Sequence, residues 1–129
     1  MKLFSVNDKV KYRFDGSTGI MYKYYFGTIT LNDIISSWDN AISEKIIPEN
    51  TKGFILDYTK ANLDIEVDKA NEVANYYRRH LDIFRGKKIA IITQTPSDIV
   101  IPIMVEKKDS GYSSHPFYTF EAAIEWVLS

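Results

Sequence analysis

The side chains best suited to catalysis are few in this sequence, and they are not grouped. His80 and His115 are the two histidines, cysteine is absent, and no His-Glu-x-x-His pattern is present. The six glycines form no phosphate-binding loop, and there is no Gly-x-Ser-x-Gly nucleophile motif. We therefore predict no catalytic residue, no metal site and no cofactor, and we expect the protein not to be an enzyme.

Asp57 is the carboxylate in the most informative position. It follows Phe54, Ile55 and Leu56, an apolar run typical of a strand buried on both faces. Ligands of open α/β sheets bind beyond the carboxyl ends of such strands. An aspartate at this position also commonly accepts backbone N–H groups of the following loop, and both interpretations stay open. On the first interpretation, we predict a partner-binding edge made of Asp57, Tyr58, Thr59, Asp64 and Glu66.

The segment from Ile99 to Val105 is apolar on almost every side and contains Pro102. It indicates either a buried, kinked helix or a surface that a partner covers. If a pocket lies between this helix and the sheet, Ile99, Ile103 and Met104 would line it and bind a small apolar, lipid-like molecule. The same segment could instead hold two copies of the chain together as a homodimer.

Alternation and turn residues predict five strands and place these residues on a sheet. The first two runs form an antiparallel hairpin around Asp15–Gly19, and we expect Ile20 to face the core while Lys23 faces solvent at an edge of the sheet. The predicted strands are Val10–Asp15, Ile20–Phe26, Gly53–Thr59, Lys88–Thr93 and His115–Tyr118.

Four helices are predicted between and after these strands. The first begins at Thr30, where Asp33 completes a capping box, and cannot continue past Pro48. The second has an apolar stripe from Val67 to Phe84, the third follows Pro96, and the fourth runs from Thr119 to Leu128. Alternating strands and helices indicate an α/β fold: a mostly parallel five-stranded sheet with an antiparallel N-terminal hairpin, in the order β-β-α-β-α-β-α-β-α.

Length and charge limit the remaining function classes. A chain of 129 residues is expected to form one domain, residues 1–129. A formal net charge of -1 gives no attraction to nucleic acid, and no apolar span reaches bilayer length. We expect a cytoplasmic protein that does not bind nucleic acid and does not span a membrane.

The order of these segments resembles the STAS-like family, named for sulfate transporters and anti-sigma-factor antagonists, and in particular its stand-alone bacterial branch. The matching segments cover almost the whole chain. They are Phe26–Asp33 after the hairpin, the strands Phe54–Thr59 and Ile89–Ile92, and the tail Phe117–Val127.

This resemblance implies a non-enzymatic regulatory module that binds a protein partner. In the anti-sigma-factor antagonists, phosphorylation of a serine in an Asp-Ser-Ser-Gly-like turn, at the start of the helix after the central strand, controls partner binding. The comparable stretch here, Leu63–Val67, lacks serine and glycine, and Glu66 places a permanent negative charge there. The phosphorylation switch is therefore not carried over to this chain.

Overall fold

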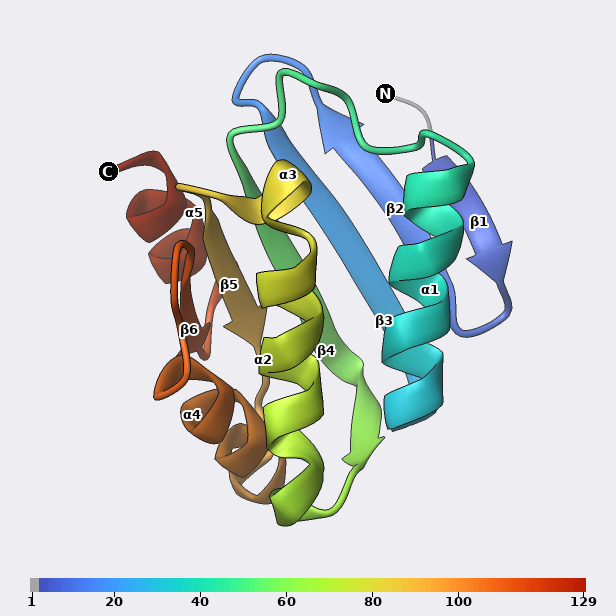
Figure 1. The fold of residues 1–129 in the computed structure, drawn as a ribbon, viewed down its shortest axis with the longest axis vertical. Coiled ribbons are helices and arrows are strands. Elements are labelled where there is room, and N and C mark those ends of the chain that lie inside the picture. The colour runs from blue at the N-terminus through green and yellow to red at the C-terminus, as the bar shows by residue number, and fades with distance from the viewer. Residues whose placement is uncertain (1–2) are drawn as a thin grey trace.

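The computed structural model describes residues 3–129, and side chains from residue 7 onward, as one α/β domain (Figure 1). Six strands lie side by side in chain order, β1-β2-β3-β4-β5-β6. The strands are β1 (Leu3–Asn7), β2 (Val10–Asp15), β3 (Ile20–Thr30), β4 (Gly53–Asp64), β5 (Lys88–Ile92) and β6 (Ser113–Phe117). The helices are α1 (Leu31–Ser43), α2 (Ala70–Arg79), α3 (Leu81–Phe84), α4 (Val100–Glu106) and α5 (Phe120–Leu128), with the short 3-10 helices η1 (Val67–Lys69) and η2 (Pro96–Ile99).

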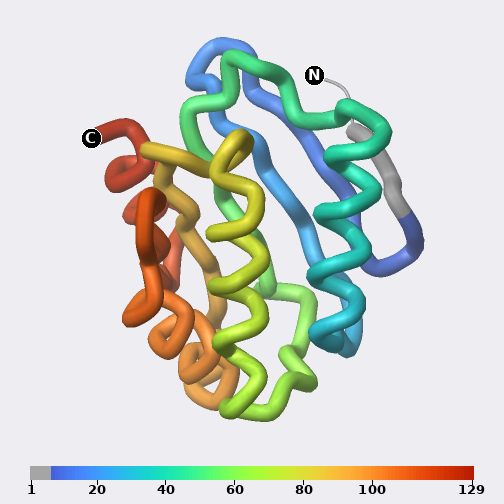
Figure 2. Tube along the Cα trace, viewed as in Figure 1, coloured from blue at the N-terminus to red at the C-terminus, as the bar shows by residue number. Residues whose placement is uncertain are grey.

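The strand order explains why the helices are divided unequally between the two faces of the sheet. β1, β2 and β3 pair antiparallel, and β3 to β6 pair parallel. Each parallel crossover moves one strand onward in the same direction, so right-handed crossovers place their helices on one face. Figures 1 and 2 show α1, α2 and α4 on that face. The predicted fold class, an α/β domain with an N-terminal antiparallel hairpin, is confirmed.

The core under α1, α2 and α4 is organised around Trp38 of α1, which is fully buried. The Trp38 ring meets Phe54 of β4 edge-on, with ring centroids 5.6 Å apart, and Phe84 of α3 at 5.2 Å. Such edge-to-face pairs favour one arrangement of the rings over others. Trp38 is therefore a core residue, as its position in the middle of the α1 stripe indicates.

A second, smaller core lies beneath α5 on the opposite face. Ala123 and Val127 of α5 pack there with Ile55 of β4 and Ile92 of β5. Gly53 permits this close approach, because a Cβ atom at that position would lie 2.5 Å from Val127 Cγ1 and 3.0 Å from the Lys88 carbonyl oxygen.

The start of α1 agrees with the predicted capping box. The Asp33 N–H donates to Thr30 Oγ1 at 3.2 Å, and the Thr30 N–H donates to Asp33 Oδ2 at 2.9 Å. This capping box gives hydrogen-bond partners to two N–H groups that the start of a helix otherwise leaves unpaired. The helix ends at Ser43, five residues before Pro48.

The N-terminal hairpin differs from the prediction in its place and its orientation. The structure has a sixth strand, β1, which pairs with β2, so the β2–β3 hairpin does not form an edge of the sheet. Met21, Lys23 and Tyr25 face the main core and are buried, while Ile20 and Tyr22 are buried beneath α5. The prediction that Lys23 faces solvent was wrong, because both alternating sets of β3 carry apolar residues and the sequence pattern alone did not distinguish the two faces.

The central strand β4 and the second helix also have different limits from those predicted. β4 continues through Thr59 to Asp64, paired with the second half of β3 after a register shift between Tyr24 and Phe26. The predicted second helix is divided into η1, α2 and α3, with a break at His80. Val67 lies in η1 and is exposed, so its assignment to the buried stripe was wrong.

Candidate functional site

Asp57 of β4 lies beside the carboxyl end of β5, as the sequence predicts. Asp57 pairs with Ile92, the last residue of β5, and Gln94 follows two residues later. β4 then continues beyond β5 with β3 as its only sheet neighbour. The site at this end is therefore bounded by the projecting part of β4, the start of α2 and the segment that leads into α4.

Asp57 has a structural role within its own strand. The side chain is 9% exposed, and Oδ1 accepts the Thr59 N–H at 2.8 Å. This bond lies where the register of β4 against β3 shifts. Asp57 therefore stabilises the irregular part of the strand, the second of the two interpretations that its position allowed.

Tyr58 is directed into the protein and not toward a partner. It is 5% exposed, and its ring stacks on Tyr25 with centroids 4.2 Å apart and planes 8° apart. Burial raises the pKa of the Tyr58 hydroxyl, because the phenolate would lose its hydration. Thr59 is half-buried, whereas Asp64 and Glu66 are exposed. The structure thus leaves Asp64 and Glu66 as the fully accessible members of the predicted edge.

α4 combines the two alternatives that its sequence left open. Ile101, Pro102 and Val105 are buried, whereas Ile103 is exposed and Ile99 and Met104 are half-buried. Pro102 does not kink the helix, because α4 begins at Val100 and the proline lies in its first turn, where a missing N–H is tolerated. The residues predicted to line an apolar pocket, Ile99, Ile103 and Met104, are therefore not those that turn most fully toward the sheet.

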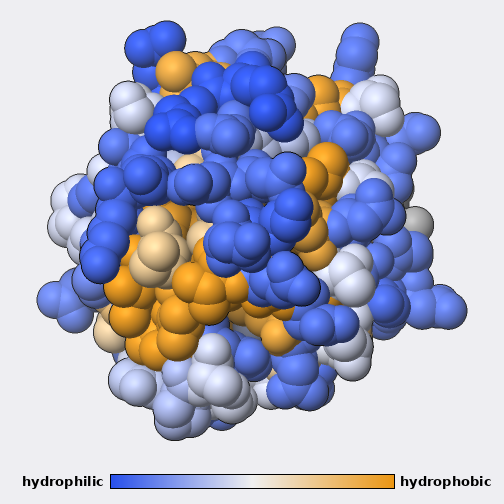
Figure 3. Space-filling model, turned by 60° about the horizontal axis from the view of Figure 1, so that its bottom comes forward, coloured by the Kyte–Doolittle hydropathy of each residue, from blue (hydrophilic) through white to orange (hydrophobic). Residues whose placement is uncertain are grey.

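An exposed apolar patch lies at this end of the molecule. We define the apolar patch as Val67 of η1, 51% exposed, with Val100 and Ile103 of α4, 40% and 39% exposed. η1 and α4 are in contact, and Figure 3 shows apolar side chains gathered on this end. Sequence reasoning missed Val67 and Val100, although Val67 stands among Glu66, Asp68 and Lys69, a setting typical of an exposed turn. A contiguous exposed apolar patch is a candidate surface for binding a partner.

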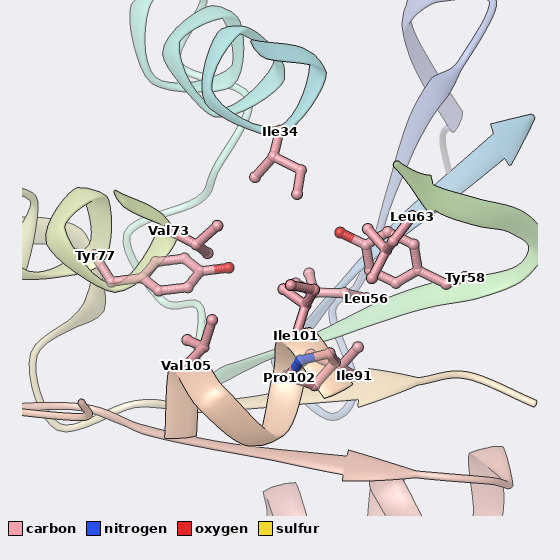
Figure 4. A pocket seen from close by; sticks show the side chains of 10 residues that line it. All are labelled: Ile34, Leu56, Tyr58, Leu63, Val73, Tyr77, Ile91, Ile101, Pro102 and Val105. Carbon is pink, nitrogen blue, oxygen red and sulfur yellow. The ribbon is translucent and has the colours of Figure 1, made fainter. Parts of the chain in front are cut away.

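A small cavity lies behind the patch, between α1, α2, α4 and the sheet (Figure 4). Its volume is about 30 Å³, and Ile34, Ile101 and Pro102 contribute apolar walls. Tyr58 and Tyr77 enter from opposite sides with their hydroxyl groups directed inward. A cavity of this size holds about one water molecule, whereas drug-sized ligands occupy several hundred Å³.

Asp98 connects the segment before α4 to the projecting part of β4. Its Oδ1 accepts the Leu63 N–H at 3.3 Å, and its Oδ2 is buried without a hydrogen bond. The Asp98 hydrogen bond therefore joins η2 to the part of β4 that extends beyond β5.

Lys23 is the chemically most unusual residue, and sequence reasoning missed it. The side chain is fully buried in the main core, and Nζ has no hydrogen-bond partner. Nζ lies 3.7 Å from the ring centroid of Trp38, 4.7 Å from that of Tyr25 and 5.4 Å from that of Tyr12. Burial lowers the pKa of the Lys23 amine well below its usual range, because the ammonium loses its hydration. Lys23 is 0% exposed, so its amine contacts neither solvent nor a substrate in this structure.

The two histidines lie in separate surroundings. His80 packs against Tyr76 with ring centroids 4.3 Å apart, and His115 Nδ1 lies 2.8 Å from Glu106 Oε2. Within residues 3–129, no three His, Asp or Glu side chains are grouped as metal ligands. In the same range, no helix has both the length and the apolar character needed to cross a bilayer.

Two solved structures share this architecture, although the sequence matches no family model. No family model matches the sequence, and no curated protein matches it. An uncharacterized protein of the DUF3478 family with a SpoIIAA-like fold, from Shewanella loihica PV-4, superposes with a TM-score of 0.63 at 14% identity, covering 96% of this chain and 98% of its own. The anti-sigma-factor antagonist SpoIIAA in its unphosphorylated form superposes with a TM-score of 0.56 at 13% identity, covering 92% of this chain and 96% of its own. The chain has the SpoIIAA-like, and hence STAS-like, fold.

Proposed function

We propose that this protein is a non-enzymatic regulatory module of the cytoplasm that binds a protein partner through the carboxyl-end surface of its sheet. This docking surface consists of the apolar patch (Val67, Val100, Ile103) and the neighbouring carboxylates Asp64 and Glu66. The exposure of three aliphatic side chains on two contacting elements carries the proposal. When a partner covers such groups and excludes water from them, binding gains about 25 cal/mol per Å² of buried apolar area.

The arrangement of reactive groups supports binding over catalysis. His80 and His115 are engaged in separate contacts, and Asp57 is occupied by a backbone N–H. Lys23 has no access to solvent. These groups do not converge on a common point, as a nucleophile, a base and an oxyanion donor must.

Glu66 gives this surface a charge that needs no kinase. It immediately precedes η1 and accepts no helix-capping hydrogen bond, so its exposed carboxylate is available to a partner. In the antagonist family that the sequence resembles, a phosphorylated serine at the start of this helix changes the charge of the docking surface. We propose that the present chain keeps one charge state, so that its binding is regulated by the abundance of the partner.

The docking surface is tested by charge insertion on the apolar patch. Ile103→Asp should remove proteins that co-purify with the tagged wild-type chain from its native cytoplasm, because the carboxylate must be desolvated on binding. Leu128→Asp is the matched control, since Leu128 is 47% exposed on α5. If both variants retain the same proteins after quantitative mass spectrometry, the docking surface lies elsewhere.

A second candidate function is binding of a small apolar molecule in the cavity of Figure 4. The inward-directed hydroxyl groups of Tyr58 and Tyr77 among aliphatic side chains favour it. Because the cavity holds about 30 Å³, a fatty acid must displace α4 to enter. Native mass spectrometry of the freshly purified protein should then show an added mass, and fatty acids should raise the Tm. Absence of both effects would refute the ligand hypothesis, and sedimentation at several concentrations separately tests homodimer formation.

A further inference from the structure

We infer that the partner presents an amphipathic segment whose apolar side fills the apolar patch and whose flank is basic. This inference rests on the proposed function and adds the chemistry of the partner. Its grounds are the separation of charge along the chain, the free state of the carboxylates and the order of apolar and acidic groups on the surface.

The acidic residues are concentrated where the apolar patch lies. From Asp57 to Glu72 the chain carries five carboxylates and two lysines, a formal charge of -3. The whole chain carries -1, so the remaining residues together carry +2. At the other end of α2, Arg78 and Arg79 occupy the last turn. The near-neutral total therefore conceals an acidic segment around η1 and a basic last turn of α2, and the acidic segment borders the apolar patch.

The carboxylates of the docking surface are available to a partner. The ion pairs found within residues 3–129 join Lys9 to Asp33 and His115 to Glu106, and neither involves this surface. Asp64, Glu66 and Asp68 are all exposed. Exposed, unpaired charges attract a partner of opposite sign over about one Debye length, roughly 8 Å at physiological salt.

The positions of these groups define what fits. Val100 and Ile103 are three residues apart on α4 and therefore lie on one side of it, and Val67 belongs to the adjoining η1. The acidic residues lie on the η1 side of this apolar patch, at Asp64, Glu66 and Asp68. A helix or strand with an apolar face and lysine or arginine along one border complements both features. The phosphates of nucleic acid and of anionic membranes would be repelled.

Two matched peptides test this inference directly. Both are 18-residue helical peptides with the same leucine face, and one has lysine where the other has glutamate along the borders. We expect the lysine peptide to bind the wild-type chain at least about tenfold more tightly at low salt, and this advantage to shrink at high salt. Fluorescence anisotropy at the two salt concentrations gives both values.

Three variants separate this inference from the proposed function. Asp64→Lys with Glu66→Lys should abolish or reverse the preference for lysine, whereas Glu121→Lys with Glu125→Lys, on exposed residues of α5, should leave it unchanged. Ile103→Asp should weaken binding of both peptides. Equal binding of the two peptides to the wild-type chain, or no binding of either, overturns the basic-partner inference. If Ile103→Asp still removes the native co-purifying proteins in that case, the proposed docking surface stands without it.

Discussion

Replacing Lys23 with methionine should stabilise the protein, which is the opposite of the usual effect of a core substitution. The amine of Lys23 is buried without a hydrogen-bond partner, among the rings of Tyr12, Tyr25 and Trp38. Methionine has a similar length and shape, and its sulfur makes favourable contacts with aromatic rings. The substitution therefore removes a polar group from the core and leaves little or no cavity.

The expected magnitude follows from opposing contributions. A buried donor without an acceptor costs about 1 to 3 kcal/mol, and burial also disfavours the charged form of the amine. Cation–π attraction to the three rings offsets about 0.5 to 2 kcal/mol when the amine is charged. We therefore expect Lys23→Met to raise the free energy of unfolding by about 2 kcal/mol near pH 7.

The pH dependence identifies the cause of this change. The pKa of Lys23 is lowered on folding, so between that lowered pKa and about 10.4 the unfolded chain binds more protons than the folded chain. Stability of the wild-type protein then rises with pH by up to about 1.4 kcal/mol per unit in this window, and the advantage of Lys23→Met shrinks accordingly. The buried tyrosines act in the opposite direction above pH 10, because burial raises the pKa of Tyr12, Tyr25 and Tyr77, and they do so in both proteins.

Urea unfolding of wild type and Lys23→Met at several pH values between 6 and 10 measures this difference. Lys60→Met is the control, because Lys60 is an exposed lysine on β4 and its loss should change stability by less than about 0.5 kcal/mol at every pH. A variant destabilised by more than 1 kcal/mol, with a difference that does not vary with pH, would refute the reasoning. The ammonium would then be charged and held by the rings.

Three further substitutions test the fold that positions the site. Gly53→Ala should lower stability by about 1 to 3 kcal/mol in urea unfolding, because its Cβ would lie 2.5 Å from Val127 Cγ1, and Val127→Ala should recover part of the loss. Thr30→Ala removes half of the α1 capping box and should cost about 1 kcal/mol by the same measurement, whereas Thr30→Ser should cost little. Pro116→Val supplies an N–H group to the edge strand β6 and should promote self-association in sedimentation experiments, and an unchanged monomer would count against the role of Pro116 in protecting that edge.

The parts of the fold that the sequence predicts are those with a single local interpretation. The unalternating runs that end at Asp57 and Ile92 are short and bounded by turn residues, which indicates buried strands, and they pair as expected. The capping residues Thr30 and Asp33 determine where α1 begins whatever packs against it. The fold class follows from such elements, because the order of strands and helices allows few topologies.

The parts that the sequence did not predict depend on long-range pairing. Lys23 could be assigned to the core only once both faces of β3 were known to be covered, and that depends on the place of β3 between β2 and β4 in the sheet. The extension of β4 depends on pairing with β3, although Ala61 and Leu63 alternate with Lys60, Asn62 and Asp64 as a strand requires. This missed alternation is why Tyr58 was expected at a surface.

The strand order gives a physical reason for placing the docking surface where it lies. α1, the η1–α2 segment and the η2–α4 segment each follow a strand of the parallel part of the sheet, and those strands all point in one direction. The starts of these helices therefore gather at one end of the molecule, as Figure 1 shows. The N-terminal ends of helix dipoles are stabilised by carboxylates, so acidic residues such as Glu66 and Glu72 collect at that end, and basic residues such as Arg79 collect at the other. The charge separation that we assign to partner recognition thus begins as a consequence of helix stability.

Helix stability does not explain the apolar patch, because Val67, Val100 and Ile103 make no contribution to helix dipoles or capping. Substitutions of these three residues should therefore affect binding more than folding.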